Sequence, residues 1–286
     1  SRLICDIYSK MDLQERIGIK LHELLSSIAN RYGLSINQIR EHLITLYLNE
    51  NKIKSVNESD SIFVENKEEL SAKDDQTNIQ KVIFFLRAWK KRTATKWLLH
   101  YIFQSTSISF RSMAKAIACL FAISNQELIT SVFKGDFSTL ISMSKSIYFL
   151  SRLELFNCKM DFSDFDKNNI NKTISKLLNK MKNTMPGIYP IIFEICLFYK
   201  IDNRNYFLDI INKLIKSRPH FILKNINNFF NTFKEYKKDK DFIDIYINVI
   251  SRPISEMISN KETTKPFKSH HLMVLRELFD TIAPEI

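Results

Sequence analysis

Glycine is scarce in this sequence: only 4 of the 286 residues are glycine, and 6 are proline. Hairpin turns, tight strand-to-helix turns and phosphate-binding loops all use glycine, because it adopts backbone conformations that other residues avoid. Apolar residues recur with helical spacing along most of the chain, and no segment alternates as a strand does. We therefore predict an all-α protein and exclude strand-rich and Rossmann-like folds.

Residues 111–133 form the most apolar helical segment of the chain. Ala114, Ala118 and Ala122 recur every four residues and form an alanine row beside a second apolar row. Small side chains let a neighbouring helix approach to the short end of the usual range of about 8–10 Å, so we predict a central helix packed along this row. The second row comprises Met113, Ile117, Leu120 and Phe121, and the residues expected to face water are Arg111, Ser112 and Lys115.

The first 49 residues are expected to form a pair of antiparallel helices. Gly33 is a suitable helix stop, and Ser35 with Gln38 has the spacing of a capping box that starts the next helix. Helical periodicity then disappears in a stretch rich in Asn, Ser, Asp, Glu and Lys, which predicts a mobile polar linker. The predicted organisation is an N-terminal helical pair (1–49), a linker (50–77) and a main domain (78–286).

The sequence of the main domain predicts a series of helices joined by short polar connections. Ser124 with Glu127 predicts a capping box, and Pro219 suits the first turn of a helix. Such a string is longer than a four-helix bundle and has no fixed repeat, so we predict an irregular α-solenoid of stacked antiparallel helix pairs. Its helices are expected at residues 79–91, 94–104, 126–133, 138–156, 168–182, 191–200, 203–216, 219–233 and 240–250.

Cysteine spacing and hydropathy indicate the compartment. The cysteines lie far apart and lack metal-ligand spacing, so we expect reduced, buried thiols in a cytosolic or nuclear protein. The longest apolar run, residues 188–199, is about half the ~20 residues of a membrane span, and we expect no membrane insertion. The chain begins with Ser1, and we take it to be a piece of a longer protein. The cysteines are Cys5, Cys119, Cys158 and Cys196.

The net charge of +11 is unevenly distributed. Residues 1–76 hold 10 Lys and Arg against 13 Asp and Glu, whereas residues 77–286 hold 32 against 18. A basic body suits acidic partners or nucleic acid, but cations spread over many helices more often serve solubility. We favour the solubility interpretation for the bulk of this charge.

No catalytic or metal-binding motif occurs in the sequence. Phosphate loops, nucleophile elbows, zinc-protease motifs and calcium loops are all missing. His270 and His271 are adjacent, whereas a metal prefers ligands four residues apart on a helix. Asp161, Asp164 and Asp166 lack the glycine and partner ligands of a calcium site. We predict a protein that is not an enzyme and has no catalytic, metal or cofactor-binding residues.

Two basic features are candidate binding surfaces. Lys172, Lys176 and Lys180 recur every four residues and form a lysine face on one side of a helix. A second group, the basic corner, lies between two helices; a solvated surface is the simpler interpretation of both features. Nucleic acid is not favoured, because Trp89 and Trp97 fall on apolar stripes instead of beside the charges. The basic corner consists of Lys90, Lys91, Arg92 and Lys96.

Three core-packing segments carry a family resemblance. They are RSMAKAIACLFAISNQELITSVF (111–133), SIYFLSRLELFNCKMDFSDF (146–165) and EICLFYKI (194–201). These segments resemble the C-terminal region of Rough deal (Rod), the large subunit of the kinetochore complex of Rod, Zwilch and Zeste White ten. The resemblance covers roughly residues 95–226 and identifies no functional side chain.

The resemblance implies a helical scaffold that serves the spindle assembly checkpoint and recruits dynein through Spindly. It implies Zeste White ten, Zwilch, Spindly and a second Rod protomer as partners, with localisation at the kinetochore and spindle in mitosis and in the cytoplasm otherwise. One alternative is a vesicle-tethering subunit at the endoplasmic reticulum, similar to Sec-thirty-nine. A second alternative is a basic solenoid that binds nucleic acid.

Overall fold

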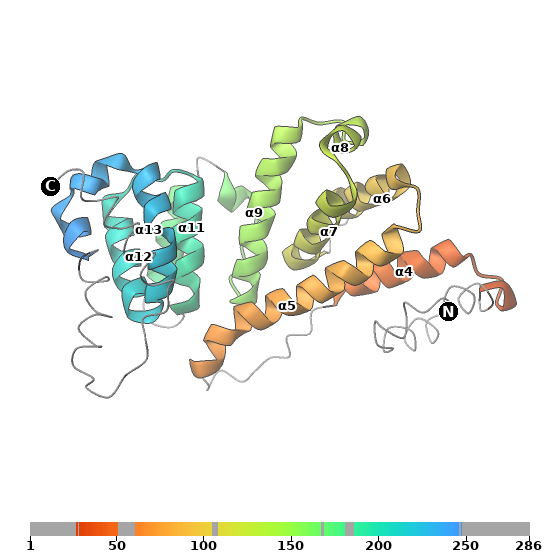
Figure 1. Ribbon diagram of the computed structural model, residues 1–286, viewed down its shortest axis with the longest axis horizontal. Coiled ribbons are helices and arrows are strands. Elements are labelled where there is room, and N and C mark those ends of the chain that lie inside the picture. The colour runs from red at the N-terminus through yellow and green to blue at the C-terminus, as the bar shows by residue number, and fades with distance from the viewer. Residues whose placement is uncertain are drawn as a thin grey trace, which may run out of the picture. The chain divides into compact units, whose positions relative to one another are not determined.

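The computed structural model describes residues 27, 29–50, 61–104, 108–166, 169–180, 186–245 and 247 (Figure 1). All regular structure within these ranges is helical, and no strand occurs among them, so the predicted all-α class is confirmed. Two compact units divide the chain, Ser1–Phe162 (unit 1) and Ser163–Ile286 (unit 2).

Each unit is built of α-helices, and short 3-10 turns occur in the described part of the chain. The α-helices of unit 1 are α4 (Ile36–Asn49), α5 (Ser61–Leu86), α6 (Lys91–Gln104), α7 (Phe110–Ile123), α8 (Gln126–Val132) and α9 (Phe137–Leu155). The 3-10 turn η1 (Phe162–Phe165) follows. Unit 2 has α10 (Ile170–Lys180), η2 (Pro186–Ile188), α11 (Tyr189–Phe198), α12 (Arg204–Ser217), α13 (Pro219–Thr232) and η3 (Lys234–Lys238). Residues 240–245 of unit 2 are also helical.

Helix ends follow local sequence signals. Gly33 has a φ of 61°, the left-handed conformation of a helix stop, and Ser35 with Gln38 makes the predicted capping box of α4. Pro219 opens α13 as predicted. The start of α8 was predicted correctly, but its cap is different: Asn125 accepts from the Leu128 amide, while Ser124 is buried.

The predicted absence of helical structure in the linker is wrong for residues 61–77, which belong to α5. Residues 51–60 lie outside the described residues. Within residues 71–77, polar groups attach α5 to the rest of unit 1: Ser71 is 2% exposed, and Asp75 forms an ion pair with Arg111 of α7. Hydrophobic periodicity cannot reveal a helix held by polar contacts. The two compact units also meet at residues 162 and 163, not at the predicted linker.

Helix α7 is central to unit 1, as predicted, because it packs against α4, α5, α6 and α9. The buried face is different from the predicted one. Ala122 and Phe121 are exposed, and the other two members of the alanine row are half-buried. The fully buried side of α7 includes three residues that were expected to face water, together with small and apolar ones. The buried residues are Arg111, Ser112, Lys115, Ala116, Ile117, Cys119 and Leu120.

Unit 2 has an apolar, aromatic core built by α11, α12 and α13, which pack against one another. Phe193 of α11 lies edge-to-face against Phe207 of α12, with ring centroids 6.0 Å apart. The ring centroid of Phe229 in α13 lies 4.8 Å from that of Phe207. The Phe229 ring is also stacked on Tyr236, with centroids 5.7 Å apart. Such pairs favour a single packing arrangement because aromatic rings attract best in offset and edge-to-face geometries.

The prediction of buried thiols is confirmed for Cys119, Cys158 and Cys196, which are free and buried. Cys5 lies outside the described residues. None of the described helices combines the length and apolar character needed to cross a membrane.

The packing of α5 predicts its resistance to proteases. We expect trypsin to spare the bonds after Lys73 and Lys81 in the native protein, because a packed helix must open before it enters a protease active site. Limited digestion followed by mass spectrometry measures the order of cleavage. Early cleavage at either bond would show that α5 opens readily.

Substitution of two alanines of α7 tests which face of this helix is buried. Ala116 is 0% exposed and Ala122 is exposed, so Ala116→Leu overpacks the interior and Ala122→Leu does not. We expect Ala116→Leu to lower the free energy of unfolding by about 1–3 kcal/mol. The Ala122→Leu control should stay within about 0.5 kcal/mol of the wild type in urea denaturation. Equal losses would contradict the assignment of the buried face.

Candidate functional site

The lysine face lies on α10 of unit 2. Lys172 and Lys176 are exposed, and Lys180 is the last residue of α10, with a side chain outside the described set. The opposite face of α10 is buried through Ile174 and Leu177, so the predicted amphipathic helix is confirmed. Like charges one turn apart repel weakly in water, which makes this face a suitable surface for an acidic partner.

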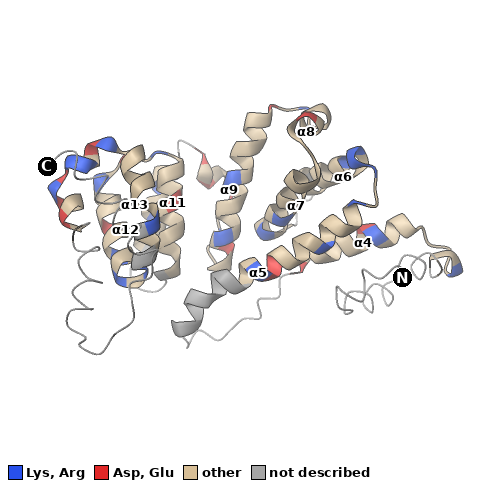
Figure 2. Cartoon of the chain, in the orientation of Figure 1, with Lys and Arg blue, Asp and Glu red and all other residues tan. Residues whose placement is uncertain are grey.

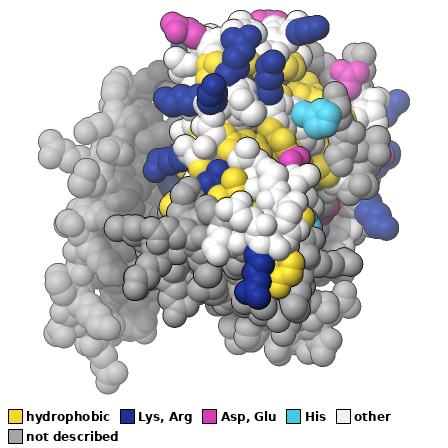
Figure 3. Space-filling model, turned by 90° about the vertical axis from the view of Figure 1, so that its right-hand side faces the viewer, with side chains coloured by type: hydrophobic (Ala, Val, Ile, Leu, Met, Phe, Trp, Pro, Cys, Tyr) yellow, Lys and Arg dark blue, Asp and Glu magenta, His cyan; other side chains and the backbone are white. Residues whose placement is uncertain are grey.

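The basic corner lies in unit 1, where α5 ends and α6 begins. All four of its side chains are exposed, and Figure 2 shows Lys and Arg at this end of α6. Figure 3 views the molecule from the side where α6 begins, and Lys and Arg side chains are concentrated over the upper part of that face. The structure thus brings the four predicted residues together at one turn.

The tryptophans beside the basic corner are engaged with the protein itself. Trp89 and Trp97 are half-buried and lie edge-to-face, with ring centroids 6.0 Å apart. Trp97 also stacks on Tyr101, 5.4 Å away, and its Nε1 donates to the Glu41 Oε1 at 2.7 Å. The predicted place of both rings on the apolar side is therefore confirmed.

A buried charge cluster, which the sequence did not predict, consists of Asp75, Arg111 and Lys115. The Arg111 Nε donates to both carboxylate oxygens of Asp75, at 2.8 and 3.1 Å, and the Lys115 Nζ lies 3.7 Å from the same carboxylate. Lys115 also donates to the carbonyl oxygens of Tyr47 and Glu50, at 3.3 and 2.9 Å. These carbonyls lie at the end of α4, so one ammonium joins α4, α5 and α7.

Burial changes the protonation of groups in and near this cluster. Desolvation lowers the pKa of Lys115 to about 8, although the negative charge of Asp75 acts in the opposite direction. Desolvation also raises the pKa of the Cys119 thiol to about 12, so this thiol stays protonated and is a poor nucleophile at neutral pH. The cluster therefore acts as a structural clamp between three helices instead of a reactive site.

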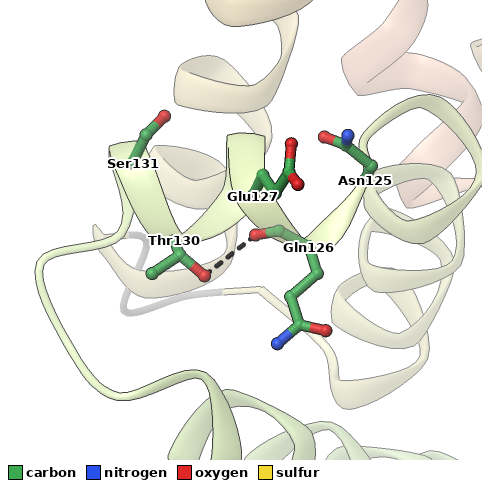
Figure 4. Close-up of a pocket in the computed structure, with 5 residues that line it drawn as sticks. All are labelled: Asn125, Gln126, Glu127, Thr130 and Ser131. Carbon is green, nitrogen blue, oxygen red and sulfur yellow. Dashed lines mark hydrogen bonds between the residues drawn. The ribbon is translucent and has the colours of Figure 1, made fainter.

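A shallow cleft of about 740 Å³ lies beside α8 (Figure 4). Its lining side chains already serve the helix backbone: Asn125 caps the Leu128 amide, Thr130 donates to the Gln126 carbonyl, and Ser131 donates to the Leu128 carbonyl. Glu127 is the one carboxylate in the lining. Three of the five lining side chains are thus already hydrogen-bonded to the backbone of α8.

Metal-binding geometry is absent from the residues that the structure describes: no group of three or more His, Cys, Asp or Glu side chains there is placed to hold an ion. Asp161 and Asp166 are exposed, and Asp164 lies in η1. His270 and His271 lie outside the described residues.

Comparison with known families decides the identity. A family model described as the Rough deal protein C-terminal region matches residues 1–258. The chain belongs to this family. The match includes α4 and α5, which the sequence resemblance did not cover. Comparison with individual curated proteins gives no match.

Membership places the chain among Rod-type kinetochore proteins, which are structural components that act in mitosis and the spindle checkpoint. A structural role agrees with the described surface, on which the candidate features are basic faces. The lysine face and the basic corner remain predicted binding surfaces.

The buried charge cluster predicts a pH dependence of stability. The pKa of Lys115 is about 8 in the folded protein, below the ordinary value of 10.5, so the unfolded chain binds more protons between these pH values. The free energy of unfolding should therefore rise with pH across that window, by roughly 1–3 kcal/mol. Urea denaturation at pH 7 and pH 9.5 measures the change.

A matched pair of variants isolates this effect. Lys115→Met removes the titrating ammonium, so the rise should disappear, whereas Lys145→Met removes an exposed lysine and should preserve the rise. The same pH dependence in the Lys115→Met variant and the wild type would contradict the assignment.

Proposed function

We propose that this chain is a non-catalytic α-solenoid scaffold segment of the Rod–Zwilch–Zeste White ten complex. In this role it supports the spindle assembly checkpoint and the recruitment of dynein through Spindly. Its place of action is the kinetochore and spindle in mitosis, and the cytoplasm otherwise. The observation that carries the proposal is the family match over residues 1–258.

The packing of consecutive helices supports the solenoid part of the proposal. Helix α4 packs on α5, α6 on α7, α11 on α12, and α12 on α13. Stacked helix pairs form extended surfaces, and such surfaces suit a subunit that holds several proteins together. Zeste White ten, Zwilch, Spindly and a second Rod protomer are the proposed partners.

Recovery of partners from cell extracts tests the proposal. We expect the immobilised chain to retain Zwilch and Spindly from mitotic extract. Membrane-fusion proteins in their place would favour the vesicle tether. Nucleic acid that binds tightly and is released steeply by salt, with neither protein set recovered, would favour the nucleic-acid solenoid.

Charge reversal of the lysine face extends this test. Changing Lys172, Lys176 and Lys180 to Glu should weaken partner recovery roughly tenfold at low salt, and less at high salt, because exposed charges act mainly on association. The matched control reverses three lysines on other helices of unit 2: Lys224, Lys234 and Lys240, all exposed. Circular dichroism should be unchanged in both variants. Equal recovery by the two variants would remove the lysine face from the proposed interface.

A further inference from the structure

We infer that the basic corner is a docking site for a short acidic peptide segment of a protein partner. The inference deepens the proposed scaffold function, because it assigns a chemistry to one binding surface. It begins with sequence: no Asp or Glu occurs between Asp75 and Glu127, whereas eight Lys and Arg do. The part of unit 1 that runs from the end of α5 to α8 thus supplies no carboxylate of its own.

Two cations of this stretch have charged or polar partners in the interior of unit 1. Arg111 and Lys115 are buried and meet Asp75 and backbone carbonyls. The basic corner is exposed, and none of its side chains makes an ion pair within the described part of the chain. Arg87, three residues before Lys90, is also exposed and adds to the same positive surface. Glu41 is the described carboxylate in contact with this region, and it accepts from Trp97 instead of a cation.

The position of the basic corner makes it unfavourable in isolation. Lys91 and Arg92 are in the first turn of α6, and this turn contains no acidic residue. The positive end of the helix dipole disfavours cations there. At the start of α12 the protein solves the same problem internally, because Arg204 is bridged by Asp239 and Asp241. An acidic ligand at the basic corner would relieve the repulsion that the described part of the chain leaves uncompensated.

The geometry favours a peptide over nucleic acid. Arg92 and Lys96 are four residues apart, so they lie on one face of α6, roughly 6 Å apart along its axis. An extended chain covers that length in about two residues, so a run of roughly three Asp or Glu residues matches this pair. Single-stranded nucleic acid uses free aromatic faces for stacking, whereas Trp89 and Trp97 are half-buried against each other and Trp97 stacks on Tyr101.

Titration of the 286-residue chain with a fluorescent ten-residue polyglutamate peptide tests the inference. We expect saturable binding that weakens with salt. A variant with Lys90, Lys91 and Lys96 changed to Glu should bind at least about tenfold more weakly. Its melting temperature should be unchanged or higher, because glutamate suits the first turn of a helix. The matched control reverses three exposed lysines elsewhere in unit 1, Lys73, Lys134 and Lys145, and should retain binding.

Four results would overturn the inference. They are absence of peptide binding, equal loss in both variants, tighter binding of a 20-nucleotide oligothymidylate that depends on the basic corner, and self-association lost in the corner variant. The oligothymidylate result would assign the surface to nucleic acid, and the self-association result to a second copy of this chain. Partner recovery from extracts uses separate readouts, so failure of peptide binding would leave the scaffold proposal standing.

Discussion

The Arg111 guanidinium and the Lys115 ammonium can enter the interior of unit 1 only because the carboxylate of Asp75 lies beside both. A buried cation without a partner is costly, whereas a cation that meets a carboxylate and carbonyl oxygens recovers most of that cost. This requirement fixes the register of α5 against α7. Since Lys115 also binds the carbonyls that end α4, the same requirement sets where α4 stops.

Both units bury apolar side chains, and unit 1 also buries a charge cluster. In unit 1 the central helix presents charged groups to the interior, so several contacts depend on exact partners. In unit 2, phenylalanine and tyrosine rings join α11 to α13. Removal of one partner of the charge cluster should therefore be damaging in unit 1, and changes of side-chain volume should be damaging in both interiors.

The charge of the surface depends on which cations are buried and which are exposed. Arg111 and Lys115 have partners in the interior of unit 1, whereas the cations at the α5–α6 turn, and Lys172 and Lys176 of α10, project into solvent. A helical protein of the Rod family with this surface acts by contact with other molecules, and charge complementarity then governs partner choice and association rate. In the cleft beside α8, the side chains of Asn125, Thr130 and Ser131 already serve the helix backbone.

Sequence alone determined the all-α class, the central place of α7, most helix boundaries and the family. Helical spacing, glycine scarcity, Gly33, Ser35 and Pro219 act locally, so they can be read without a fold. Only the tertiary structure decided which side of α7 is buried and that residues 61–77 are helical. Both depend on Asp75 meeting Arg111, two residues 36 positions apart in the chain. Sequence alone predicts that a charged residue faces solvent, because burial of a charge is favourable only beside a partner, and the sequence does not show that partner.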